Sequence, residues 1–112
     1  MSVNSIIKNA VEHIAPIRAG QYMPADPEET YIVFNYNSLP TDHADDAPEH
    51  EIYFVQVHLF CSGGFNSLAM RRDIKKRLFA AGFTFPAAID ASDADGQHHV
   101  FECQITAIAG GE

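Results

Sequence analysis

The residues of this sequence that could bind a metal are histidines and cysteines in its second half. His58 and Cys61 lie close together, and His98, His99 and Cys103 follow further along. Thiolate and imidazole are the ligands that zinc prefers. On one β-strand, however, His99 and Cys103 would lie roughly 13 Å apart at about 3.3 Å per residue, whereas ligands of one zinc ion lie about 2 Å from it. His58 and Cys61 differ in strand parity. We therefore predict no metal site and interpret these residues as core or edge side chains, with both thiols reduced.

A second candidate is a calcium-binding loop that would begin at Ala91. Positions 3, 5, 6 and 12 of the EF-hand template carry Asp93, Asp95, Gly96 and Glu102. The first position, normally Asp, is Ala91, and the eighth, normally apolar, is His98. The flanking residues favour strands, whereas the motif requires helices. We interpret the segment as an acidic hairpin turn.

Nucleophilic and phosphate-binding patterns are equally incomplete. Ser62 lies in Cys-Ser-Gly-Gly rather than in the G-x-S-x-G elbow. Cys61 with His58 has no orienting third group, and the Gly63-Gly64 pair lacks any longer phosphate-binding motif. We predict no catalytic residues, no enzyme activity and no cofactor.

The charged residues are strongly segregated along the chain. The net charge is -8, from 15 acidic and 7 basic residues, and such a chain repels nucleic acid through its overall field. Five of the seven basic residues fall between Arg71 and Arg77, and eight of the fifteen acids fall between Asp26 and Glu51. Opposite charge on two separate segments favours a head-to-tail contact between identical subunits, which gives a ring if the rotation closes.

This segregation predicts an inter-subunit interface, with a solvated helix face and a nucleic-acid contact as the alternatives for the basic segment. The acidic side is an exposed loop over residues 37–49, continuing to Glu51. The expected interface residues are Arg71, Arg72, Lys75, Lys76, Arg77, Asp42, Asp45, Asp46, Glu49 and Glu51. Reversing the charges of Lys75 and Lys76 is expected to weaken the ring.

The elements that would carry these residues follow from apolar periodicity. Apolar residues from Val3 to Ile14 repeat at helical spacing, with Ser2 or Asn4 as the cap and Pro16 as the stop. A loop over residues 23–29 precedes a strand over residues 31–36. A second helix is expected over residues 65–81, ended by Gly82.

The strongest strand runs from Glu51 to Cys61 and has two different faces. Tyr53, Val55, Val57 and Leu59 share a uniformly apolar face, which should meet the core. The other face mixes aromatic and polar groups, including Phe54 and Phe60. Either another subunit or the chain's own loops would cover it.

The remaining strands complete a single domain over residues 1–112. A short strand is expected within residues 83–89, interrupted by Pro86, and a final one over residues 99–107, joined by a turn at Asp95-Gly96. The order of elements predicts an α+β fold with a mainly antiparallel β-sheet and two helices packed on one face. No apolar stretch is long enough to span a membrane. The N-terminus lacks the features of a signal peptide, so synthesis in the cytoplasm is expected.

The run Glu29-Thr-Tyr-Ile-Val-Phe-Asn-Tyr36, the acidic loop and Tyr53-Phe-Val-Gln-Val-His-Leu-Phe60 resemble the tail-terminator or tail-completion proteins of long-tailed bacteriophages. The resemblance continues through Gly64-Phe-Asn66, the basic helix, Ala81-Gly-Phe83 and Val100-Phe-Glu-Cys103. It rests on the order and spacing of elements over residues 28–106, and no single residue is diagnostic.

This resemblance implies a ring of identical subunits, typically a hexamer, at the head–tail junction of a virion. Such a ring ends the tail tube and presents a surface to the head connector, so the implied partners are the chain itself, the tail tube protein and the connector protein. DNA would meet the protein only by passing through the lumen. The alternatives are a head-completion or stopper protein, and a small acidic module that binds a cation or a protein.

Overall fold

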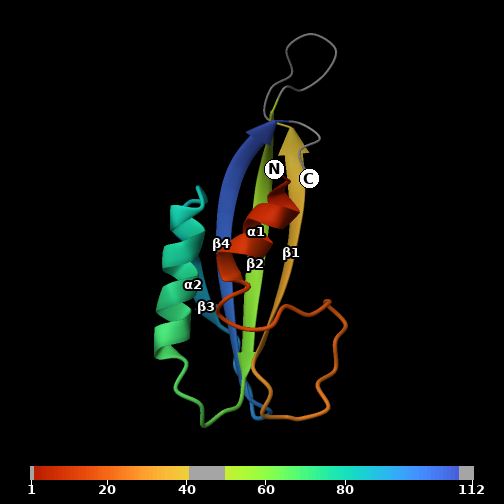
Figure 1. Cartoon of the computed structure of the whole chain (residues 1–112), viewed down its shortest axis with the longest axis vertical. Coiled ribbons are helices and arrows are strands. Elements are labelled where there is room, and N and C mark those ends of the chain that lie inside the picture. The colour runs from red at the N-terminus through yellow and green to blue at the C-terminus, as the bar shows by residue number, and fades with distance from the viewer. Residues whose placement is uncertain (1, 41–49, 109–112) are drawn as a thin grey trace.

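The computed structural model describes residues 2–40 and 50–108, which form two helices and four strands (Figure 1). The elements, in chain order, are α1 (Val3–Val11), β1 (Tyr31–Pro40), β2 (His50–Cys61), α2 (Leu68–Ala80), β3 (Ala87–Asp90) and β4 (Gln97–Ile108). The strands form one antiparallel sheet in the order β1-β2-β4-β3. The expected α+β fold with a mainly antiparallel sheet is confirmed.

Helix α1 begins where the sequence predicts and ends earlier. The Ser2 hydroxyl accepts a hydrogen bond from the Ser5 amide at 3.1 Å, so Ser2 is the cap. The helix stops at Val11, and Ile14 donates its amide to the Val11 carbonyl in a turn. Pro16 keeps the residue before it out of helical geometry, so the helix cannot resume after this turn, but the proline does not set the end at Val11. Residues 16–18 then run beside β1 through a parallel bridge between Ile17 and Ile32.

The structure confirms the two different faces that were predicted for strand β2. Tyr53, Val55, Val57 and Leu59 are each at most 1% exposed and face the core. The alternate residues of the strand are half-buried on the opposite face. This central strand pairs with β1 on one side and β4 on the other, so its register fixes the positions of side chains across the whole sheet.

Strand β1 is longer than predicted, and the predicted start of the acidic loop is wrong. Residues Asn37 to Pro40 continue the strand and pair with Phe54 to Glu51 of β2. The polar composition of this stretch favours a loop, but the partner strand provides a ladder, and a proline is tolerated at the end of an edge strand. Glu51 is accordingly a strand residue. The rest of the predicted loop, over residues 41–49, lies outside the described residues.

Helix α2 begins at Leu68 rather than at Phe65, because residues 62–67 form a turn that brings Ser67 to its N-terminus. Its predicted stop is confirmed: Gly82 has φ +109°, a conformation that favours glycine. Strand β3 starts after Pro86, and β4 starts at Gln97, two residues earlier than expected. Asp93 and Gly96 bridge across the β3–β4 turn.

Both helices pack on one face of the sheet, as predicted (Figure 1). Val3, Ile7 and Val11 of α1 and Ile74 and Leu78 of α2 form one buried cluster with the inward residues of β2 and β4. The opposite face of the sheet has no helix over it within the described part of the chain. No helix in that part is long and apolar enough to cross a membrane.

Candidate interaction surface

The face of the sheet opposite the helices, here called the outer face, presents five cross-strand rows of side chains. The antiparallel register of β1, β2 and β4 defines these rows. In order from one end they are Tyr31–Phe60–His98, Val33–His58–Val100, Asn35–Gln56–Glu102, Asn37–Phe54–Gln104 and Leu39–Ile52–Thr106.

The outer face is nearly free of charged side chains. Glu102 is the only Asp, Glu, Lys or Arg in the five rows, although charged residues make up 20% of the whole sequence. Surfaces that are buried in protein–protein contacts are depleted of charge and enriched in aromatic residues at their centre. The outer face therefore has the composition of a covered surface.

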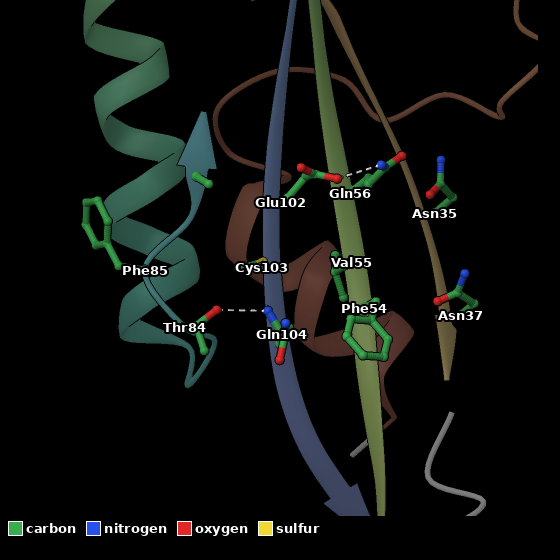
Figure 2. Close-up of a pocket in the computed structure, with 11 residues that line it drawn as sticks. Asn35, Asn37, Phe54, Val55, Gln56, Thr84, Phe85, Glu102, Cys103 and Gln104 are labelled. Atoms are coloured by element: carbon green, nitrogen blue, oxygen red, sulfur yellow. Dashed lines mark hydrogen bonds between the residues drawn. The ribbon is translucent and has the colours of Figure 1, made fainter. Parts of the chain in front are cut away.

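A shallow groove of about 510 Å³ runs over the middle of the outer face (Figure 2). Four of its eleven lining residues carry side-chain amides, Phe54 and Phe85 also line it, and Phe85 is 61% exposed. The Gln56 amide donates a hydrogen bond to Glu102 Oε2 at 2.9 Å. The side-chain amides of Asn37 and Gln104 have no protein partner among the described residues, so they are available to another molecule.

The end of the outer face near Tyr31 is covered by the chain itself. The rings of Tyr31, Phe60 and His98 stack in a row, with centroid separations of 4.9 and 4.2 Å. Tyr22, from the segment over residues 19–30, contacts Tyr31 edge-on at 5.2 Å. The sequence left two possibilities for what covers this face, another subunit or the chain's own loops. At the end near Phe60, the chain's own loop covers it. Phe54 lies in the open groove.

Two of the candidate zinc ligands, His58 and His98, meet on the outer face. Nδ1 of His58 lies 2.8 Å from Nε2 of His98, a hydrogen bond that requires one ring to donate and the other to accept. Burial lowers the pKa of both histidines, and the neighbouring His98 lowers that of His58 further. No group of three or more potential metal ligands occurs among the described residues. The pairing follows from strand register, which sequence spacing alone does not reveal.

The candidate pair of Cys61 and His58 is separated by the sheet. Cys61 lies on the inner face, buried, and His58 lies on the outer face. Both cysteines are free thiols, as expected. Burial raises the pKa of Cys61 and raises that of Cys103 to about 11, which keeps both protonated at neutral pH and unreactive.

A serine, histidine and aspartate that the sequence reasoning missed lie together at the N-terminus of α2. Ser67 Oγ is 3.5 Å from His99 Nε2, and His99 Nδ1 is 3.9 Å from Asp90. The Ser67 hydroxyl donates to Gln97 Oε1 at 2.7 Å and accepts from Arg71 Nε at 3.0 Å. It is 1% exposed. Because the Ser67 hydroxyl donates to Gln97 and accepts from Arg71, the cluster ties the start of α2 to β4.

The five basic residues of α2 have different environments. Arg71 is half-buried in the Ser67 cluster, and Arg77 pairs with Asp73 at 3.6 Å. Arg72, Lys75 and Lys76 have no ion pair with any described residue, and Arg72 and Lys76 are exposed. They are the cations of the helix that remain available to a partner.

The acidic half of the predicted interface is only partly described. Asp42, Asp45, Asp46 and Glu49 lie outside the described residues. Glu51 is half-buried in β2 and accepts a hydrogen bond from the Tyr53 hydroxyl at 2.7 Å. The pairing of this loop with α2 of a neighbour therefore stays a prediction.

The rejected calcium loop is a hairpin turn between β3 and β4, as predicted. Asp93 Oδ1 accepts a hydrogen bond from the Asp95 amide at 2.9 Å, and the flanking segments are strands.

No protein-family model matches this chain, and no curated protein matches its sequence significantly. The resemblance to the tail-terminator proteins therefore rests on the sequence features given above.

Proposed function

We propose that this protein is a structural subunit that assembles with copies of itself into a ring, and that the ring ends a phage tail tube and joins it to the head connector. The observation that carries the proposal is the outer face, which bears Glu102 as its only formal charge in five rows of side chains. Such a face suits coverage by another protein. The resemblance of residues 28–106 to tail terminators supports this kind of assembly.

Self-assembly is tested by light scattering after size exclusion, at low and high salt and up to millimolar protein. We expect a discrete oligomer, a hexamer in the family, that salt loosens because charged patches contribute to the contact. A monomer under every condition would contradict assembly of the free protein.

The role at the tail end is tested separately, with the tail tube protein encoded in the same genome. Tubes polymerised with the chain present are expected to carry a ring at one end in electron micrographs, and their further growth at that end is expected to stop. Bare ends in the presence of excess chain would contradict the terminator role and leave self-assembly standing.

A further inference from the structure

A pocket of about 340 Å³ lies at the self-covered end of the outer face. Met23 and Pro24 form one wall, the stacked rings of Tyr31 and Phe60 contribute apolar surface, and the β3–β4 turn supplies Asp93 and Asp95. Met23 is 85% exposed. We call this the acidic pocket.

The acidic pocket has uncompensated negative charge. A third carboxylate on its lining, Glu29, forms an ion pair with Arg18 at 3.6 Å and accepts a hydrogen bond from the Tyr22 hydroxyl at 2.9 Å. Asp93 and Asp95 have no ion pair with any described residue. An apolar wall beside two carboxylates that lack ion pairs fits a long basic side chain, whose aliphatic stem packs on the wall while its charged head reaches the carboxylates.

Helix α2 presents the matching feature on its solvent side. Leu68, Arg72, Lys76 and Phe79 lie on one stripe, because these positions are three or four residues apart. Leu68 and Phe79 are 43% and 58% exposed, and the two cations between them are exposed and unpaired among the described residues. The stripe lies opposite the buried Ile74 and Leu78, so it points away from its own core.

The pocket and the stripe cannot meet within one chain. The pocket opens on the outer face, whereas α2 packs on the other face of the sheet (Figure 1). We propose that the acidic pocket of one copy receives Arg72 and Lys76 of α2 from a second copy. This inference rests on the proposed self-assembly. It joins two different surfaces, so the contact is head-to-tail and propagates into a ring when the rotation closes.

The test is a charge swap measured by light scattering and sedimentation at low salt. Asp95→Lys and Lys76→Glu are each expected to weaken association about tenfold or more, as like charges then face each other. The double variant Asp95→Lys with Lys76→Glu is expected to recover association to within about threefold of the wild type, since the pair is restored with reversed sign. Glu12→Lys and Lys8→Glu are the matched controls, because they make the same charge changes at exposed positions, at the C-cap of α1 and within α1 respectively.

The outcomes separate this inference from the proposed function. Suppose that the wild type assembles but neither single variant weakens association, or that the double variant does not recover association. Then α2 of a second copy does not occupy the pocket, whereas self-assembly itself stands. If Asp95→Lys alone weakens assembly, the pocket meets a different cation, which also overturns the proposal. A wild type that stays monomeric under every condition overturns this inference and the assembly of the free protein, and the tail tube experiment then decides the role at the tail end.

Discussion

At the scale of single residues, the pair of His58 and His98 makes stability depend on pH. Their hydrogen bond forms only while at least one ring is neutral, since two protonated rings both donate. Burial lowers the pKa of both rings in the folded protein, although Glu102 and Asp93 act in the opposite direction. The pKa of buried His99 is lowered too, by its burial and then by Arg71.

The direction of this dependence follows from linkage. Below an unfolded-state pKa of about 6.5, the unfolded chain binds protons that the folded histidines still exclude. The free energy of unfolding is therefore expected to fall as pH is lowered from about 6.5 towards the folded pKa values, and to be retained above about 6.5. Urea unfolding at pH 7.5 and pH 5.5 measures this difference.

His58→Gln is expected to reduce the difference between the two pH values and not to abolish it, because His98 and His99 remain. His13→Gln is the control, since His13 is exposed at the end of α1. Equal pH dependence in the wild type and in His58→Gln would contradict a contribution from this histidine.

At the scale of elements, the β3–β4 turn depends on Gly96. This residue has φ +153°, and a Cβ at its position would lie 2.9 Å from the Cys61 carbonyl oxygen, which belongs to the end of β2. Any other residue at this position would strain its own backbone. Its Cβ would also clash with the Cys61 carbonyl, which the β2 ladder holds in place.

Gly96→Ala is therefore expected to lower the free energy of unfolding by about 2 kcal/mol or more. Gly64→Ala is the matched control, because a Cβ at Gly64 meets no atom within 4 Å, and its effect is expected to stay below about 1 kcal/mol. Urea unfolding of the two variants makes the comparison. Similar values for both would show that the turn relaxes without cost.

The elements themselves were predictable where periodicity was strong. The alternation in β2 gave both of its faces correctly, and the apolar spacing that begins at Val3 includes the buried residues Val3, Ile7 and Val11 of α1. The boundaries failed where tertiary contacts outweigh local preference. Asn37 to Pro40 are polar and favour a loop, but the ladder from β2 extends β1 through them.

The candidate surface was only partly predictable for the same physical reason. The sequence of β2 alone shows that one of its faces mixes aromatic and polar residues. The low charge of the whole outer face depends, in addition, on which residues of β1 and β4 lie beside those of β2. That register brings His58 to His98 and Gln56 to Glu102. Likewise, the Ser67 cluster joins residues that are distant in sequence, so no local spacing indicates it.

At the scale of the whole molecule, the core lies between the helices and the inner face of the sheet, and no described helix covers the outer face. A face that stays hydrated in the functional state tolerates an added charge. A face that another protein covers does not, because burying an unpaired charge costs free energy. Adding a charge to the groove therefore distinguishes the two states.

Gln56→Glu makes this change with almost no alteration of shape. It replaces the Gln56–Glu102 hydrogen bond, 2.9 Å long, by two adjacent carboxylates on a half-exposed surface. In the monomer the cost is expected to be at most about 1 kcal/mol, since water screens both groups. In the assembly the two charges would be desolvated together, and association is expected to weaken about tenfold or more.

Glu102→Gln is the matched control, because it leaves two neutral amides and is expected to assemble at least as well as the wild type. Light scattering for assembly and urea unfolding for the monomer measure the two effects independently. If Gln56→Glu assembles like the wild type, the middle of the outer face stays hydrated in the ring and lines its lumen or exterior instead of a contact.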